Sequence, residues 1–140
     1  MFRRTRRPPF GRKRRRGAAA VEFALVAPVL FLVIFGIVEV GRAIMVQQLL
    51  TNASREGARH AVIESSTSGE VVQLIQEYLN YCSISHAEIQ ITPENLATLG
   101  PGDSVSVGIK VPLDKVSWVP IMNLNIIMSA KSVMKAERFE

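Results

Sequence analysis

Residues 14–39 read RRRGAAAVEFALVAPVLFLVIFGIVE, and this stretch decides how the rest of the chain is organised. A basic run ends at Gly17, a single carboxylate follows at Glu22, and residues 23–38 carry no charged side chain. These sixteen residues fall just short of the ~20 that cross a hydrocarbon core, and the small and apolar residues on either side supply the missing length. The stretch therefore predicts one membrane-spanning helix.

Three charged side chains border the predicted span. Glu22 lies near its first end, and Glu39 and Arg42 lie near its second. An ionised side chain at the bilayer centre costs at least ~2.5 kcal/mol on insertion scales, and none of the three needs to lie there. The charges therefore agree with a membrane-spanning helix.

The positive charge of the chain is confined to its beginning. Nine of the 17 Lys and Arg residues lie in the first sixteen positions. The rest of the chain contains the other eight together with all twelve Asp and Glu, so its net charge is −4. The positive-inside rule keeps such a basic leader in the cytoplasm and sends the acidic C-terminal part across the membrane. We therefore predict a single-pass protein with a cytoplasmic N-terminus and an extracytoplasmic C-terminal domain.

A basic arm in a chain with a pI near 9.9 could instead bind nucleic acid. Counterion release would supply affinity for phosphates. The arm directly abuts the apolar span, however, and only Phe2 and Phe10 could stack on bases. We therefore predict no nucleic-acid partner.

A cleaved secretory signal also begins with basic and then apolar residues. Its apolar region is ~7–15 residues long and ends at small residues, after which the mature chain starts without a helix. Here the helical pattern continues beyond Val38 through Arg42 and Leu49, with no breaker until well past Ala61. The pattern does not favour an ordinary signal peptide.

The residues around Gly17 resemble the processing site of type IV prepilins, in which basic residues and a glycine precede a stretch such as AAAVEF and a long apolar helix. More narrowly, GAAAVEFALVAPVLFLVIFGIVEVGR followed by LTNASREGARHAV resembles the TadE-like proteins of the tight-adherence (Flp) pilus system. The resemblance extends from Arg15 to about Val62 and is weaker over residues 129–137. It implies a pilin-like subunit in the bacterial inner membrane.

The resemblance also implies a processing site that consists of four residues. A prepilin peptidase would cut between Gly17 and Ala18, which makes Glu22 the fifth residue of the mature chain, followed by Phe23. In pilin-like proteins this glutamate pairs with the free amine of a neighbouring subunit, because opposite charges in a low-dielectric setting are tolerated together. Without processing, Glu22 would be a carboxylate solvated at the cytoplasmic interface, and Gly17 would be a linker glycine.

Several residues along the helix are candidates for helix packing in an assembly. Pro28 removes one helical hydrogen bond and bends the helix. The charged residues include pairs three apart, which contribute only ~0.2–0.5 kcal/mol each, so a solvated face explains them more simply. The candidate assembly residues are Glu22, Pro28, Glu39, Arg42, Arg55, Glu56 and Arg59.

The helix is predicted to continue out of the membrane as a spine, from Ala18 to about Ile63. Polar residues dominate its second half, and one apolar stripe remains. The stripe consists of Val46, Leu49, Leu50, Ala53, Gly57 and Ala61. It requires a partner surface, which the C-terminal domain could supply.

Residues 64–140 are predicted to form a small head domain, after the leader (residues 1–17) and the helix (residues 18–63). A serine-rich break precedes residues 70–81, which resume a helical pattern. The apolar face of this helix is predicted to carry Val71, Ile75, Tyr78 and Cys82, with Val72 and Leu79 beside them. A helix with one apolar face is expected to pack on a sheet.

Alternating residues predict three strands in the head, over residues 87–92, 103–111 and 124–136, with a turn at residues 100–103. Their short connections favour antiparallel pairing. The inward side chains are predicted to be Val105, Val107, Ile109 and Val111 in the second strand, and Leu124, Ile126, Met128, Ala130, Met134 and Ala136 in the third. The predicted fold class is therefore α+β.

Residues that could carry chemistry are few. Cys82 has no second cysteine in the chain to pair with, and His60 and His86 occur in no metal-binding motif. The sequence contains no phosphate-binding glycine loop and no GxSxG motif. We therefore predict no enzyme activity, no cofactor, no metal and no small-molecule substrate.

Two functions remain open. The first is a pilin-like minor subunit or assembly factor of a tight-adherence pilus, with the inner membrane, a prepilin peptidase, other pilin-like subunits and the pilus assembly platform as partners. The second is an uncleaved, single-pass, membrane-anchored binding module that recruits another envelope protein. The fate of residues 1–17 separates the two.

Overall fold

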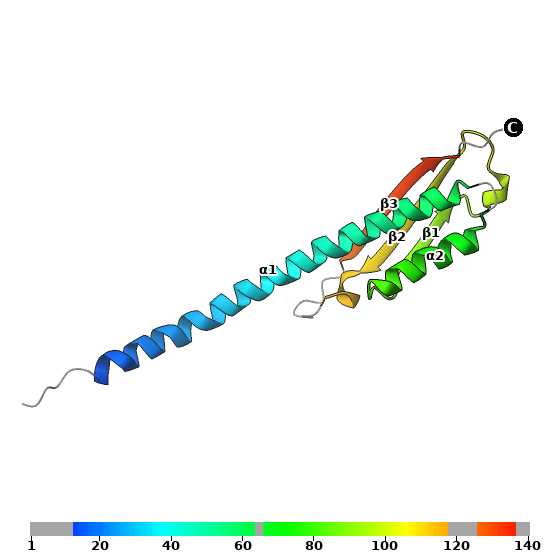
Figure 1. Ribbon diagram of the computed structural model, residues 1–140. Helices are drawn as coiled ribbons and strands as arrows, with labels where there is room; N and C mark the ends of the chain where they lie inside the picture. Colours follow the sequence, from blue (N-terminus) through cyan, green and yellow to red (C-terminus); the bar gives the residue numbers. More distant parts are fainter. Residues whose placement is uncertain (1–12, 64–65, 118–125, 137–140) are drawn as a thin grey trace, which may run out of the picture. The chain divides into compact units, whose positions relative to one another are not determined.

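The computed structural model describes residues 13–63, 66–117 and 126–136. The chain divides into two compact units, Met1–Val38 and Glu39–Glu140. Its elements, labelled in Figure 1, are α1 (Lys13–Ala61), α2 (Ser68–Tyr81), β1 (Glu88–Thr92), η1 (Leu96–Thr98), β2 (Ser104–Pro112), η2 (Leu113–Lys115) and β3 (Ile127–Lys135). The predicted α+β class, with one long helix, one short helix and a three-stranded antiparallel sheet, is confirmed.

Helix α1 starts before the predicted Ala18 and ends at Ala61, just short of the predicted Ile63. Residues 13–16 are all Lys or Arg, which are good helix formers. They therefore continue the helix backwards through Gly17, into the end of the predicted leader. Gly17 consequently lies inside a helix in this structure and is not a helix boundary.

Helix α2 begins at a capping box formed by Thr67 and Glu70. The Thr67 hydroxyl accepts a hydrogen bond from the Glu70 amide at 3.3 Å, and the Glu70 carboxylate accepts one from the Thr67 amide at 2.9 Å. The backbone hydrogen bond from Thr67, followed by the one with its side chain, lowers the pKa of the Glu70 carboxyl below its usual value. The cap satisfies amides that would otherwise lack partners, so the helix starts at Ser68, two residues before the predicted start.

The buried face of α2 differs in one position from the prediction. Val71, Ile75 and Leu79 are buried, whereas Tyr78 is 37% exposed. Residues four apart share one face of a helix, so the face that starts at Val71 continues through Ile75 to Leu79. Cys82, also predicted on this face, is half-buried at the C-terminal cap.

Strand β2 is the central strand of the sheet, which has the order β1-β2-β3. Both neighbours pair with it antiparallel, Ile91 opposite Val107 in β1 and Ser132 opposite Val107 in β3. Its predicted inward residues Val105, Val107, Ile109 and Val111 are fully buried. The prediction for this strand is confirmed, because a strand paired on both sides and covered on one face must alternate strictly.

The turn before β2 is formed by residues 100–103, as predicted. The Asp103 amide donates a hydrogen bond to the Gly100 carbonyl at 3.2 Å. Gly102 has a φ of +83°, which is the backbone that the third position of a type II turn requires, with proline preferred at the second. The Pro101-Gly102 pair therefore sets the geometry with which the chain enters β2.

Strand β3 is shorter than predicted. It begins at Ile127, and Ile126, predicted to point inward, is 45% exposed. Leu124 lies outside the described residues. Farther along the strand the predicted inward face is observed: Met128, Ala130 and Ala136 are buried and Met134 is half-buried.

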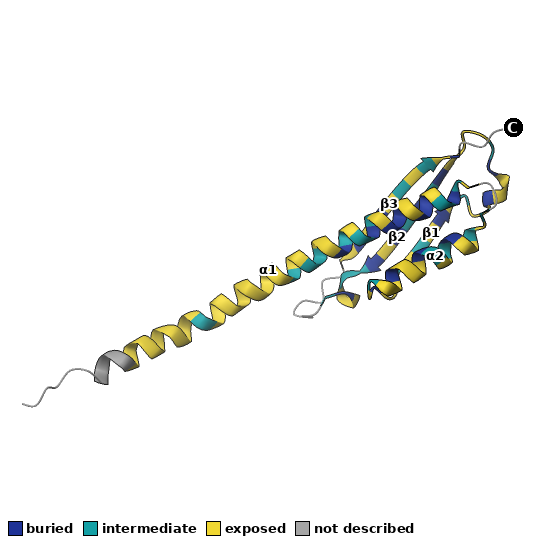
Figure 2. Ribbon diagram, viewed as in Figure 1, coloured by how far each residue is buried: buried dark blue, intermediate teal, exposed yellow. Residues whose placement is uncertain are grey.

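Within the unit Glu39–Glu140, α1 and α2 lie on the same face of the sheet (Figure 1). The apolar stripe of α1 is buried there, and Leu49 is half-buried at its margin. Figure 2 shows the buried residues of this part of α1 beside the buried strand residues. The fully or almost fully buried residues of α1 are Val46, Leu50, Ala53, Ser54, Ala58 and Ala61. The head domain therefore supplies the partner surface that the stripe requires.

Close contact between α1 and α2 depends on Gly57. A Cβ at this position would lie 2.4 Å from Ile75 Cδ1, 3.0 Å from Ile75 Cγ1 and 3.4 Å from Val107 Cγ1. Ile75 and Val107 are themselves fully buried, so neither has free space to move into. Gly57 thus lets α1 approach both α2 and the centre of the sheet.

We predict that Gly57→Leu will destabilise the head by about 1–3 kcal/mol, the usual cost of forcing extra carbons into a packed core. The measurement is proteolysis of the full chain in detergent micelles across a series of urea concentrations. Gly69→Leu is the matched control, because a Cβ at Gly69 would meet nothing within 4 Å. Equal protease resistance of the Gly57 variant and the control would contradict the prediction.

Candidate processing site and assembly helix

The first half of α1 exposes its apolar side chains on all sides. Phe23 is 70% exposed and Leu32 is 72% exposed, and residues 28–38 are exposed throughout (Figure 2). Within the described residues, Gly17–Ala61 is the helix long and apolar enough to cross a membrane. A helix that is apolar all round needs lipid or other apolar helices around it.

The four predicted processing residues lie on this exposed part of α1. Ala18, Glu22 and Phe23 are exposed, and a Cβ at Gly17 would meet nothing within 4 Å. Ala18 and Glu22 are four residues apart, which places them on one face of the helix. Nothing within the described chain therefore requires glycine at position 17 or a carboxylate at position 22.

Pro28 and two further glycines also lie on the apolar part of α1. Pro28 is inside the helix, where it leaves the carbonyl of Ala24 without its usual helical partner. A Cβ at Gly36 or Gly41 would meet nothing within 4 Å. These residues leave space on the helix surface that no described part of this chain fills.

Arg42 connects α1 with the region between β2 and β3. Its Nε donates a hydrogen bond to the Val116 carbonyl, and one turn later Gln47 Nε2 donates one to the Ser129 carbonyl at 2.8 Å. Both acceptors belong to the same unit as these two residues. Arg42, predicted as an assembly residue, therefore has a contact inside the head.

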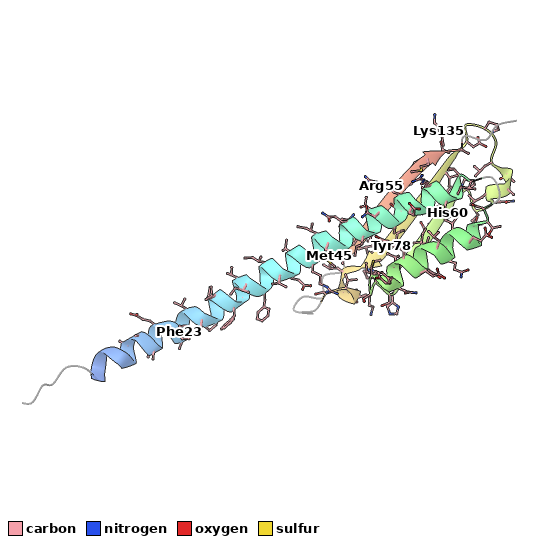
Figure 3. The ribbon with its side chains drawn as sticks, viewed as in Figure 1. Phe23, Met45, Arg55, His60, Tyr78 and Lys135 are labelled. Atoms are coloured by element: carbon pink, nitrogen blue, oxygen red, sulfur yellow. The ribbon has the colours of Figure 1, made fainter. Side chains whose placement is uncertain are left out.

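Arg55, Glu56 and Arg59 are exposed on α1, on the side away from the core; Figure 3 labels Arg55. Glu56 and Arg59 do not form the ion pair that their spacing suggested, and the ion pair in the described part of the chain joins Lys115 and Asp114 at 3.6 Å. Glu39 is half-buried at the start of the second unit. The predicted assembly residues thus do not converge on one site.

The structure reveals a polar pair, one member buried and the other half-buried, that the sequence analysis missed. Ser54 is fully buried; its hydroxyl lies 2.9 Å from the Thr51 carbonyl and 3.1 Å from the Ser132 hydroxyl of β3. Both serines occupy positions of apolar faces, Ser54 on α1 and Ser132 between Ala130 and Met134 on β3. The helical spacing from Leu50 to Ser54 could have identified the first of them.

The described residues offer little for catalysis. They contain no group of three or more His, Cys, Asp or Glu side chains that could hold a metal ion. The hollow over the outer face of the sheet, about 310 Å³, is shallow and lined in part by Gln90, Ser106 and Lys110.

We predict that Arg42→Met will loosen the segment that follows η2, while Arg59→Met will not. The first substitution removes a charge-assisted hydrogen bond, worth about 1.5–3 kcal/mol in general and less for a partly exposed pair. The measurement is hydrogen exchange at the Val116 and Ser117 amides of the full chain in micelles. Faster exchange in both variants, or in neither, would contradict the prediction.

Comparisons with known proteins identify one segment of the chain. Residues 17–59 match the sequence model of a protein family described as TadE-like protein. The chain matches none of the curated proteins and none of the solved structures with which it was compared. The matched segment begins at Gly17 and contains the whole apolar part of α1. The predicted resemblance is thereby confirmed, and over residues 17–59 this chain is similar to TadE-like proteins.

Proposed function

We propose that the chain is a pilin-like minor subunit or assembly factor of a tight-adherence pilus. The observation that carries the proposal is the TadE-like match over residues 17–59, since it begins at the glycine of the predicted processing site. In this proposal the leader, residues 1–17, is cytoplasmic, α1 crosses the inner membrane, and the head lies outside it. The protein acts through contacts and not through catalysis.

The exposed apolar surface of α1 supports a role in helix packing. Its side chains between Phe23 and Val38 have no partners among the described residues that would bury them. In a bilayer, close helix contact uses small residues that let backbones approach, and Gly36 and Gly41 offer such positions. Pilin-like subunits and the pilus assembly platform are the partners that this surface would contact.

Processing would turn the start of α1 into a charged pair. A prepilin peptidase adds water across the peptide bond between Gly17 and Ala18, which creates a free amine on Ala18. Glu22 is then the fifth residue, exposed on the same helix face. A carboxylate and an ammonium group that both enter an apolar assembly are stabilised by pairing between subunits.

A second function is favoured by one observation. Gly17 is helical, and the helix continues from Lys13 without a break. A protease that binds its substrate in extended form must first unwind this turn, so an intact leader would follow if unwinding does not occur. The chain would then be a single-pass anchor whose head recruits another envelope protein, and Glu22 would be an interfacial carboxylate.

We predict that Gly17→Leu will block maturation, because the bulky side chain does not fit a narrow protease subsite and strengthens the helix by roughly 1 kcal/mol. The measurement is the intact mass and N-terminal sequence of the protein from membranes of cells with and without a prepilin peptidase. Gly36→Leu, where a Cβ also meets nothing within 4 Å, is the control and should be processed normally. A wild-type chain that always retains Met1–Gly17 would eliminate processing and leave the anchored binding module.

We predict that Glu22→Ala will be cut normally but will assemble poorly, because the new amine of Ala18 then lacks its carboxylate partner. The measurement is the recovery of the mature protein with its pilus partners after membrane solubilisation. Glu77→Ala removes an exposed carboxylate from α2 and serves as the control. Normal assembly of the Glu22 variant would reduce this residue to a solvated helix end.

A further inference from the structure

The head separates its charges along the sequence and in space. Residues 60–109 contain no Lys or Arg. In this segment the described carboxylates Glu70, Glu77, Glu88 and Glu94 are exposed on α2, on β1 and just after β1, and Asp103 is exposed in the turn before β2. Exposed cations lie on α1 and on β3 and include Arg55, Arg59, Lys131 and Lys135. Lys110 of β2 is a further exposed cation, and it lies opposite Glu88 in the register of β1 with β2.

This separation coincides with the two edges of the sheet. Strands β1 and β3 are the outer strands in the order β1-β2-β3. Glu88 of β1, and Lys131 and Lys135 of β3, all alternate with residues of the buried face, so they share the outer face of the sheet. One edge is therefore acidic, the opposite edge is basic, and both present their charges on the same face.

The backbone of β3 is open along its basic edge. Ala136 uses both of its backbone groups on the β2 side, with bonds of 2.8 Å from the Gly102 amide and to the Asp103 carbonyl. Successive residues of an antiparallel strand direct their backbone amides and carbonyls to opposite sides. Lys131, Val133 and Lys135 therefore direct these groups away from β2. Among the described residues, Gln47 is the one that bonds to this edge, at the Ser129 carbonyl.

The acidic edge is open by the same reasoning. The odd-numbered residues of β2 bond to β3, so its even-numbered residues direct their backbone groups toward β1. There they bond to Glu88, Gln90 and Thr92, their partners in the register. Ile89 and Ile91 then direct their amides and carbonyls away from the sheet. No described residue bonds to these groups, and a hollow lined by Gly69 and Val72 of α2 runs beside the strand.

We propose that the head binds a second copy of this chain, with the β3 edge of one copy against the β1 edge of the next. The two strands run in the same direction within one head, because both pair antiparallel with β2. Added side by side, they form a parallel pair and extend the sheet. Lys131 lies level with Gln90 across the sheet, two residues from Glu88, so an unshifted extension places Lys131 diagonally across from Glu88.

Pairing of like edges is disfavoured by charge and by direction. Two β3 edges would bring Lys131 and Lys135 of one copy against the same lysines of the other, and like charges on adjacent strands destabilise a sheet. Antiparallel pairing of equal edges would also invert one head relative to the other. The proposed function anchors all copies in one membrane with one orientation, and the inference rests on it in this respect alone.

The proposed contact is heterologous, because each copy uses two different surfaces. Such a contact leaves one β1 edge and one β3 edge unused in every pair, and it therefore continues from copy to copy. Lysines on an edge strand commonly prevent unwanted pairing. Here they would select a carboxylate-bearing edge and reject a second lysine-bearing edge.

The experiment uses the full chain in membranes, expressed as a mixture of nitrogen-14 and nitrogen-15 copies. A zero-length carbodiimide cross-linker joins a lysine amine to a contacting carboxylate with loss of water. We expect mixed-isotope peptides that link Lys131 or Lys135 to Glu88 or Glu94. Cross-links at these residues only within one copy would overturn the proposal.

Charge reversal supplies the second arm of this test. Lys131→Glu and Glu88→Lys should each lower the association of differently tagged copies by about tenfold, since each replaces an attraction between exposed charges on adjacent strands by a repulsion. The chain that carries both substitutions should recover association, because every contact again joins opposite charges. The controls Lys115→Glu and Asp114→Lys change the same charges at η2, and they should have no effect.

The charge pairing would be refuted if the double variant did not recover association while both single variants remained folded, as judged by their resistance to proteolysis. Unchanged association of the Lys131→Glu variant would also contradict the proposal, because the lysines would then only prevent unwanted strand pairing. The intact mass of the same samples reports whether the leader was removed. Loss of head pairing and loss of processing are therefore separate outcomes.

Discussion

The head depends on the burial of one face of α1 between α2 and the sheet. Val46 and Leu50 are almost completely removed from solvent there, and the burial of each such side chain contributes about 1.5–3 kcal/mol. A domain of this size has a marginal core by itself. The helix that leaves the membrane is therefore also a structural element of the head, which cannot be understood as a globular domain tied to an independent anchor.

Small residues have two different explanations along α1. In the second half they fit the fold itself: a Cβ at Gly57 would meet the side chains of Ile75 and Val107, and Ser54 shares a hydrogen bond with Ser132. In the first half, Gly36 has no such neighbour within the described chain. The same residue types thus serve packing within the head and leave unused surface in the apolar part, where lipid or other helices would lie.

The predictions that succeeded were those that a single periodicity controls. The alternation in β2 identified all four of its buried residues, since both faces of a central strand are determined by its pleat, and the helical stripe of α1 was equally clear. Tyr78 was misplaced because three- and four-residue spacings both fit a short helix.

Ser132 was missed because a serine was not expected on an inward face, and its partner Ser54 is 78 residues away in sequence. The start of β3 was wrong because apolar residues at the end of a strand are not necessarily buried. The processing residues stay a prediction from the sequence, because their roles depend on molecules outside this chain.

An open strand edge is normally a hazard, because it pairs with any extended chain that approaches it. The proposed anchoring in a membrane would restrict the approach, since every head would then emerge in the same direction and move in one plane. Inverted pairings are then excluded by geometry, and among the remaining ones the lysines of β3 and the glutamates around β1 distinguish unlike edges from like edges. In this proposal, a basic leader that sets the orientation of α1 in the membrane would also determine which surfaces of the head can meet. Two edges that would endanger a freely diffusing protein become, under this constraint, surfaces that only a correctly oriented neighbour can reach.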